Sequence, residues 1–346
     1  METIYVVTGC TGYVGNVLTK KLMSENARVT GLARNPEKVK RVFGENPPDI
    51  VYGDVRNPED VARLFRSADA EYVVLHTVAF VTIGEGSADD LFGITVGGTS
   101  NVVKEALRHK VRKFLQISST DAIPEGVRLS EDLSDYRPSE NRKSGYSAAK
   151  SRADEIVLQA AREQGLNASI LLFSSVLGPG DYSRSHMSQV MCDCAAGKLP
   201  ASVDAGYNDF DIRDVADVLP AIVEKSRRGE CYLFANRPDK INDVLHVVAE
   251  KYGRKPPVTL PMWVAYAGLP FLTLYAKIRG KRPLYPRAAL APLRGNADFP
   301  IGKARREFGY SPRPLRQTVL DHLAFLESIG EIRPETTKSY NPYGQP

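Results

Sequence analysis

The chain has 346 residues, which is enough for one or two domains with a full hydrophobic core. Hydrophobic residues make up 42% of it, and its net charge of +5 is scattered rather than gathered in blocks, which argues against a nucleic-acid-binding protein. The four cysteines form no Cys-x-x-Cys pair and the five histidines show no ligand spacing, so we predict no disulfide framework and no metal site.

The first residues, METIYVVTG, enter a strand and lack the features of a secretory signal, so we expect a cytoplasmic protein. The first half of the chain alternates short β-rich runs with longer helical patterns. Strands that are apolar throughout are typical of a parallel sheet covered on both faces, so the pattern predicts an α/β fold. We expect strands at 4–9, 27–34, 49–55, 71–79, 113–120 and 167–178, and helices at 14–25, 35–44, 58–68, 88–110 and 146–164.

Three glycines lie three residues apart between the first strand and the first helix. Glycine is needed where the chain turns with positive φ, where backbone approaches a ligand, and where a helix packs tightly on a sheet. The N-terminus of a helix offers N–H groups and the positive end of a dipole, which together favour a pyrophosphate. We therefore predict a dinucleotide site, contacted by Gly9, Thr11, Gly12, Tyr13, Val14 and Gly15.

The end of the second strand bears on which dinucleotide is bound. An acidic residue there would bond a ribose 2′-hydroxyl and repel a 2′-phosphate, but this chain has Arg34. Arginine holds a phosphate through charge-assisted hydrogen bonds worth ~1.5–3 kcal/mol each. We predict NADP as the cofactor, with NAD left open. Asp54, after the third strand, is expected to accept a bond from the adenine amino group or to cap a turn or helix, and Val55 is expected to contact the cofactor.

Polar side chains follow two further strands, at the edge where parallel sheets bind ligands. We expect His76 to line the cofactor groove, although a core histidine is equally compatible with the sequence, and Thr77 to contact the cofactor. Ser119 ends the fifth strand, and its hydroxyl is expected to hold a substrate carbonyl oxygen, with Thr120 as second choice. Val176, at the end of the sixth strand, is the last expected cofactor contact.

Tyr146 and Lys150 lie four residues apart, and therefore on one face of the predicted helix, one turn apart. A carbonyl reductase needs a proton donor beside the hydride acceptor. Free tyrosine has a pKa near ~10, and a neighbouring ammonium lowers it. We predict that Tyr146 is the proton donor, and that Lys150 lowers its pKa and bonds the nicotinamide ribose.

The pattern changes after about residue 180, where helices and short strands are less regular. Segment 260–282 contains an apolar and aromatic stretch interrupted by Pro270, which is too short and too broken for a membrane span. We expect this segment to cover the core and line an apolar substrate pocket. The alternative is a peripheral membrane contact, since four cations end it.

At these positions the chain resembles the extended branch of the short-chain dehydrogenase/reductase superfamily, also described as the NAD-dependent epimerase/dehydratase family. The resemblance implies a Rossmann-type doubly wound parallel sheet in an NADP-binding domain at 1–178. It also implies a smaller α/β substrate domain at 179–330 and a flexible tail at 331–346. It leaves open that part of the substrate-domain range crosses back into the Rossmann sheet. The motifs that carry it are TGCTGYVG (8–15), GDV (53–55), LHTVA (75–79), ISST (117–120), YSAAK (146–150), GPGD (178–181), DIRDVAD (211–217) and the C-terminal stretch 303–326.

The resemblance further implies a Ser119–Tyr146–Lys150 triad and a small-molecule substrate, and it leaves a homodimer open because members of this branch are often dimers. Within the branch, Arg34 and the apolar segment look most like dihydroflavonol reductases and 3β-hydroxysteroid dehydrogenases. The expected activity is interconversion of a ketone and a secondary alcohol on an apolar cyclic substrate, such as a steroid or flavonoid.

Two alternatives are kept. One is a nucleotide-sugar epimerase or dehydratase with tightly held NAD, and the other is a non-catalytic dinucleotide sensor similar to the NmrA type. Thr95, where many members have Asn, and Leu177, where many have Tyr, weaken the epimerase alternative. The Tyr146–Lys150 pair weakens the sensor alternative, because such sensors commonly lack it.

Overall fold

The computed structural model describes residues 2–80, 88–124, 126–141, 143, 145–264, 267 and 298–333. The chain divides into two compact units, each made of segments that are separate in the sequence. The first unit comprises Met1–Ser174, Ile212–Ala235 and Phe299–Ser311, and the second comprises Ser175–Asp211, Asn236–Asp298 and Pro312–Pro346.

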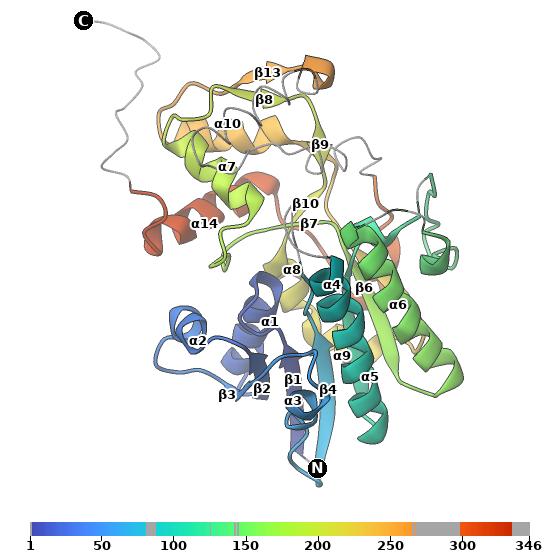
Figure 1. Ribbon diagram of the computed structural model, residues 1–346. Coiled ribbons are helices and arrows are strands. Elements are labelled where there is room, and N and C mark those ends of the chain that lie inside the picture. The colour runs from blue at the N-terminus through green and yellow to red at the C-terminus, as the bar shows by residue number, and fades with distance from the viewer. Residues whose placement is uncertain are drawn as a thin grey trace, which may run out of the picture. The chain divides into compact units, whose positions relative to one another are not determined.

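The first unit is built on a seven-stranded parallel sheet in the order β11-β6-β5-β4-β1-β2-β3 (Figure 1). The strand order reverses between β1 and β4, which is the place where open α/β sheets bind ligands at the carboxyl ends of their strands. The predicted Rossmann-type parallel sheet is therefore confirmed. The strands are β1 (Glu2–Thr8), β2 (Arg28–Ala33), β3 (Asp49–Tyr52), β4 (Ala70–His76), β5 (Lys113–Ser119), β6 (Ala168–Phe173) and β11 (Cys231–Phe234).

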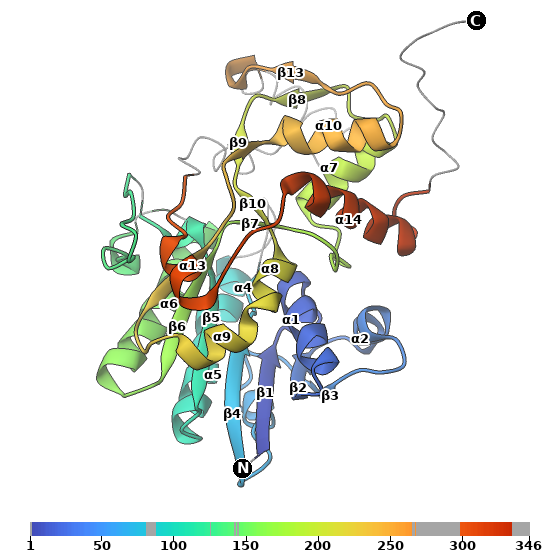
Figure 2. The ribbon, with the colours of Figure 1, turned by 180° about the vertical axis from the view of Figure 1, so that it is seen from behind.

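Helices cover both faces of this sheet. On one face α5 packs between α3 and α6, and on the other α1 packs on α8 while α9 packs on α13 (Figures 1 and 2). Buried aliphatic side chains such as Val6, Val74 and Val157 form the core between the sheet and its helices. The helices are α1 (Tyr13–Ser24), α2 (Pro36–Phe43), α3 (Pro58–Ala62), α5 (Gly98–Arg108), α6 (Gly145–Glu163), α8 (Ile212–Asp217), α9 (Leu219–Lys225) and α13 (Gly302–Phe308).

The helix predicted at 88–110 is interrupted. It consists of α4 (Ala88–Phe92), a π-helical turn at Gly93–Gly97, and α5. Thr95 in the π turn is fully buried, and its carbonyl oxygen accepts a hydrogen bond of 2.6 Å from Thr99 Oγ1. Such π turns are frequent at functional sites because they re-aim the side chains of a helix.

The strand predicted at 167–178 is two strands that belong to different units. Ser174 donates its N–H to the Phe234 carbonyl oxygen at 3.1 Å, whereas Ser175 donates to the Asn208 carbonyl oxygen at 3.1 Å. The chain therefore changes sheets after β6 and begins β7 (Ser175–Leu177), which pairs with β10 (Asp209–Asp211) in the second unit.

The division into units also differs from a single boundary at residue 178. Residues 212–235 and 299–311 lie beyond that boundary but belong to the first unit, because β11 is its outermost strand beside β6 and α13 packs on α9. The tail predicted at 331–346 lies outside the described residues from residue 334 onward.

The second unit packs α7 (His186–Ala195), α10 (Ile241–Lys251) and α14 (Leu315–Ser328) around an apolar core that includes Met191, Leu245 and Leu323. Three two-stranded sheets accompany these helices. They pair β7 with β10, β9 (Gly206–Tyr207) with β12 (Asp239–Lys240), and β8 (Ala201–Val203) with β13 (Val258–Leu260). Among the described residues, no helix is long and apolar enough to cross a membrane.

Candidate active site

The loop after β1 requires glycine at two positions. Gly9 has a φ of +72°, in the left-handed region that residues with a side chain rarely adopt. A Cβ atom on Gly15 would lie 2.2 Å from the Gly9 carbonyl oxygen and 2.7 Å from Thr77 Oγ1. Thr77 Oγ1 itself donates to the Thr8 carbonyl oxygen at 2.7 Å, so the residue after β4 braces the loop. The loop backbone is thereby held close against the end of the sheet.

The N-terminus of α1 follows this loop. Gly12 is its N-cap residue, and no side chain caps the helix. Thr11 is buried, whereas Tyr13 and Val14 are half-buried. Backbone N–H groups and the dipole at a helix N-terminus favour an anion. The residues present therefore fit the pyrophosphate of a dinucleotide, which the loop from Gly9 to Gly15 would hold.

Cys10, inside the glycine loop, is a packing residue. Its side chain is fully buried, and its Sγ atom donates to the Leu32 carbonyl oxygen at 3.4 Å. Burial raises the pKa of the thiol to about 12, so it stays protonated and unreactive at neutral pH.

Two arginines flank Asp54 where β2 and β3 end. The Arg34 side chain is 62% exposed, and its Nη1 atom lies 3.7 Å from Asp54 Oδ2. Arg56 donates Nη2 to Asp54 Oδ2 at 2.8 Å and Nε to Oδ1 at 3.1 Å, and these bonds lower the pKa of Asp54. The sequence analysis missed Arg56, although it follows Asp54 by only two residues. The bond expected from Asp54 to adenine stays a prediction, since Arg56 already engages both carboxylate oxygens.

Val55 packs between the end of β3 and the start of α5, which the sequence did not predict. Its side chain is buried against Gly98, where an added Cβ atom would come within 2.6 Å of Val55 Cγ1. Asn101 donates its side-chain amide to the Val55 carbonyl oxygen at 3.1 Å. These contacts pin the end of β3 to the start of α5, and a contact between Val55 and the cofactor stays a prediction.

His76 is a core histidine with both ring nitrogens engaged. Its side chain is fully buried, with Nδ1 2.7 Å from Thr8 Oγ1 and Nε2 2.9 Å from Thr99 Oγ1. Because Thr99 uses its hydroxyl proton to bond the Thr95 carbonyl oxygen, Nε2 must donate to Thr99 and Nδ1 must accept from Thr8. Burial lowers the pKa of His76 to about 3, so the ring is neutral. Of the two readings that the sequence allowed, the geometry supports the core histidine, because neither ring nitrogen is left for a cofactor.

The structure brings the three predicted catalytic residues to the carboxyl end of β5. Ser119 ends that strand, and its Oγ atom accepts the Asp121 N–H at 3.1 Å. Tyr146, in the first turn of α6, lies close enough to Ser119 for the serine hydroxyl to act on the pKa of its phenol. Lys150 is almost fully buried one turn later, and its Nζ atom donates to the Ile117 carbonyl oxygen at 2.7 Å. The tyrosine and serine hydroxyls can therefore bond one substrate oxygen together.

The electrostatics of this triad differ from the prediction. Burial and the nearby Asp121 carboxylate raise the pKa of Tyr146 well above its ordinary value, and the neighbouring Ser119 hydroxyl only partly offsets this rise. The expected lowering by Lys150 is wrong, because the ammonium group bonds the Ile117 carbonyl oxygen and burial outweighs charge. Burial also lowers the pKa of Lys150 to about 8, against the opposing effect of Asp154.

Asp154 is a functional candidate that the sequence analysis missed. It follows Lys150 by four residues on α6 and is fully buried. Its Oδ2 atom accepts the Ser118 hydroxyl at 2.5 Å and the Tyr136 hydroxyl at 2.7 Å. Burial raises the pKa of Asp154 to about 6, and these bonds and the Lys150 charge oppose the rise. The signal was present, since the spacing that joins Tyr146 to Lys150 continues to Asp154.

The remaining predictions fall elsewhere. Val176 is half-buried on β7, which belongs to the second unit, and its contact with the cofactor stays a prediction. Of the segment 260–282, residues 265, 266 and 268–282 lie outside the described part of the chain. Among the described residues, no group of three or more His, Cys, Asp or Glu side chains is placed to hold a metal ion.

Comparison with known proteins matches residues 5–233 to the model of the NAD dependent epimerase/dehydratase family. The chain is 27% identical over 337 residues to "Sterol demethylase protein B" of Methylococcus capsulatus, covering 94% of this chain and 99% of that protein. It is 26% identical to "3beta-hydroxysteroid-dehydrogenase/decarboxylase isoform 1" of Arabidopsis thaliana, covering 96% of this chain and 82% of the relative. The crystal structure of gox2253 is similar with a TM-score of 0.76 and 27% identity, covering 95% of this chain and 99% of that one.

Proposed function

The chain belongs to the NAD-dependent epimerase/dehydratase family, and from this premise we propose that it is an NADP-dependent oxidoreductase that interconverts a ketone and a secondary alcohol. The observation that carries the proposal is the neighbouring pair of hydroxyls at Ser119 and Tyr146, with the buried Lys150 one turn further along α6. Two neighbouring hydroxyls at the carboxyl edge of the sheet suit a carbonyl oxygen that must become an alcohol.

Each residue of the triad has a separate task. Bound NADPH supplies the hydride. The Ser119 hydroxyl donates a hydrogen bond to the carbonyl oxygen and stabilises the negative charge that develops on it. Tyr146 gives its phenolic proton to that oxygen, and its raised pKa keeps the proton in place at neutral pH until the oxygen becomes more basic. Lys150 gives one N–H to the Ile117 carbonyl oxygen, and its remaining N–H groups are proposed to bond the nicotinamide ribose of the cofactor.

The preference for NADP rests on Arg34. Its side chain is mostly exposed at the end of β2, and its contact with Asp54 is long, at 3.7 Å. Arg56 satisfies the Asp54 carboxylate by itself. The Arg34 guanidinium is therefore available for the 2′-phosphate that distinguishes NADP from NAD.

The apolar cyclic substrate is supported by two lines of reasoning. The names of the relatives from Methylococcus capsulatus and Arabidopsis thaliana both refer to sterol or steroid chemistry. The sequence from Pro261 to Ile278 is rich in apolar and aromatic residues, as a pocket for a ring system requires. We propose a steroid-like or flavonoid-like ketone as the substrate class.

The test is an assay of NADPH and NADH oxidation by the purified protein with a panel of steroid, flavonoid and simple cyclic ketones. We expect turnover with at least one cyclic ketone and a preference for NADPH. Mass spectrometry of the protein as purified is the companion measurement. Tightly bound NAD, together with conversion of a nucleotide sugar without net oxidation, would instead establish the epimerase alternative.

A further inference from the structure

The first unit contains a cavity away from the triad. Its volume is about 420 Å³, within the range of roughly 300–1,000 Å³ that small-molecule sites occupy. Arg227 and Gly229 reach it just before β11, at the amino end of that strand, and Arg162 reaches it from the last turn of α6. Tyr146 begins the same helix, so the cavity and the triad are separated by roughly 24 Å of helix, at about 1.5 Å per residue.

Charged side chains dominate the lining, which comes from four places in the sequence. They are the loop before α6, the C-terminal half of α6, the turn into β11, and α13. Five cationic side chains face three carboxylates, so the cavity carries an excess of positive charge. The lining residues are Asp132, Leu133, Ser134, Tyr136, Arg137, Leu158, Arg162, Arg227, Gly229, Glu230, Cys231, Lys303, Arg306 and Glu307.

Two of the cations are fixed by acidic partners. Lys303 is 3% exposed, and its Nζ atom donates to Glu230 at 2.5 Å and to the Asp132 carbonyl oxygen at 2.9 Å. Arg227 forms two bonds with the Glu307 carboxylate, at 2.9 and 3.1 Å. In each of these two pairs a carboxylate balances the charge of the cation. We call the pairs Lys303–Glu230 and Arg227–Glu307 the floor of the cavity.

The third carboxylate, that of Asp132, is hydrogen-bonded within its own turn. Asp132 accepts hydrogen bonds from the Ser134 N–H at 3.1 Å and the Ser134 hydroxyl at 2.8 Å, and from the Ser130 hydroxyl at 2.9 Å. It makes no ion pair with an arginine among the described residues.

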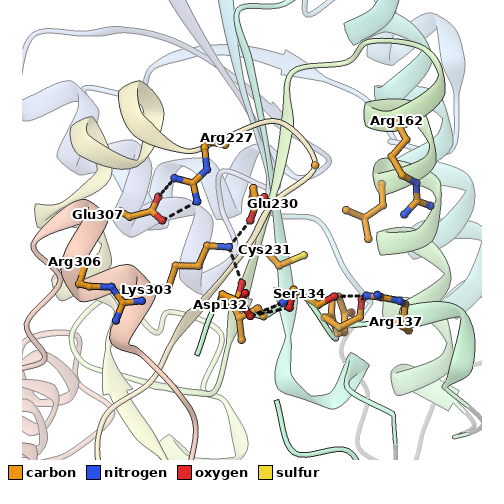
Figure 3. A pocket seen from close by; sticks show the side chains of 14 residues that line it. Asp132, Ser134, Arg137, Arg162, Arg227, Glu230, Cys231, Lys303, Arg306 and Glu307 are labelled. Carbon is orange, nitrogen blue, oxygen red and sulfur yellow. Dashed lines mark hydrogen bonds and ion pairs between the residues drawn. The ribbon is translucent and has the colours of Figure 1, made fainter. Parts of the chain in front are cut away.

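Three exposed arginines complete the lining without an acidic partner in the described part of the chain. Arg137 donates only to the carbonyl oxygens of its own turn, at Ser134 and Tyr136, and Arg162 and Arg306 make no hydrogen bond there. Figure 3 shows Arg137 and Arg162 on one side of the cavity and Arg306 with Lys303 on the other. A guanidinium presents parallel N–H groups that match the oxygens of phosphate and carboxylate. The cavity thus offers donors from two sides to an anion between them.

We propose that this cavity is a second ligand site, which binds a small molecule carrying two or more phosphate or carboxylate charges. Arg137 and Arg162 would hold one end of the ligand and Arg306 the other, above the floor made by Lys303 and Arg227. The ligand is distinct from the cofactor, whose proposed site lies at the opposite edge of the sheet.

The experiment is isothermal titration of the full chain with inorganic pyrophosphate and, separately, with citrate. Both titrations use saturating NADPH, which keeps the anions from the glycine loop, and sodium chloride holds the ionic strength constant. Arg162→Gln and Arg306→Gln are the test variants. Arg152→Gln on α6 and Arg305→Gln on α13 are the matched controls, because they remove one arginine from the same helices outside the cavity.

We expect saturable binding of at least one of the two anions, weakened roughly tenfold or more in each test variant and unchanged in the controls. Thermal unfolding of all four variants should match the original chain, which shows that they fold. Binding of pyrophosphate alone would identify a phosphate ligand, and binding of citrate alone a carboxylate ligand. Absence of saturable binding of both anions, or equal affinity in test and control variants, would overturn the proposal.

Discussion

Two of the sites that bury carboxyl groups, one in each unit, surround them in opposite ways. In the first unit Asp154 accepts hydrogen bonds from the Ser118 and Tyr136 hydroxyls, and the Lys150 ammonium is its charged neighbour. In the second unit Asp209 lies beside Asp239, and none of their four carboxylate oxygens has a hydrogen-bond partner among the residues that the structure describes.

The pKa values follow the partners rather than the burial. Both Asp154 and Asp209 are almost fully buried. The pKa of Asp154 rises only to about 6, so the group is ionised at neutral pH. Burial raises the pKa values of Asp209 and Asp239 as well, and the neighbouring Asp209 carboxylate raises that of Asp239 further, so the pair keeps a proton at neutral pH. At these two sites, the buried carboxyl group with hydroxyl and ammonium neighbours is ionised at neutral pH, and the carboxyl pair without them keeps a proton.

The largest effect is expected when Asp154 loses its function as an acceptor. Asp154→Leu leaves two buried hydroxyls and the Lys150 ammonium without their partner, and should lower the free energy of unfolding by about 3–5 kcal/mol. Glu155→Leu, at the next and more exposed position of α6, is the control and should change it by less than about 0.5 kcal/mol. Denaturant unfolding measures both. Equal losses in the two variants would show that the Asp154 network contributes nothing particular.

A gentler substitution separates charge from hydrogen bonding. Asp154→Asn still accepts hydrogen bonds from the two hydroxyls but removes the negative charge that supports Lys150. The pKa of Lys150 should then fall below about 8, so activity should decline at a lower pH than in the original chain. The pH profile of kcat/KM measures this shift. A basic limb that does not move would mean that Asp154 does not act through Lys150.

The next prediction concerns the buried carboxyl pair of the second unit, Asp209 and Asp239. The pKa of Asp209 is higher in the folded chain than in the unfolded one, so its contribution to stability is present at low pH and is lost as pH rises through the folded pKa. Asp209→Asn removes this loss. The variant should be more stable than the original chain at pH 8, by on the order of 1 kcal/mol, and nearly equal to it at pH 4. A variant that is less stable than the original chain at pH 8 would contradict the raised pKa of Asp209.

The smallest effect on stability is expected at an exposed charge. Arg34→Ser should leave the unfolding free energy within about 0.5 kcal/mol, because the side chain is 62% exposed and its contact with Asp54 is long. The preference for NADPH over NADH should nevertheless fall about 10- to 100-fold. The ratio of kcat/KM for the two cofactors measures it, with Arg28→Ser, at the other end of β2, as the control.

The comparison also shows what the sequence could predict. The alternation of apolar strands and helices predicts the parallel sheet, and the four-residue spacing predicts that Tyr146 and Lys150 share a helix face near Ser119. Asp154 was within reach of the same spacing. The direction of the pKa shift of Tyr146 could not be predicted from the sequence, because it depends on how deeply the phenol is buried and on Asp121 in a separate turn.

Contacts between distant segments account for the other differences. Asp209 and Asp239 meet because β9 pairs with β12, two-residue strands that no periodicity reveals. The break of the strand predicted at 167–178 depends on two hydrogen bonds that reach different partners, Phe234 and Asn208. The cationic cavity needs α13 to pack beside β11, about seventy residues away in the sequence.

The central claim is that the Tyr146 hydroxyl delivers the proton in carbonyl reduction, and Tyr146→Phe tests it most directly. With the preferred ketone and NADPH, kcat should fall roughly 10²- to 10⁴-fold, while the affinity for NADPH and the unfolding free energy stay unchanged. Tyr52→Phe, which removes an exposed hydroxyl at the end of β3, is the matched control and should keep full activity. Full turnover by Tyr146→Phe would contradict the account.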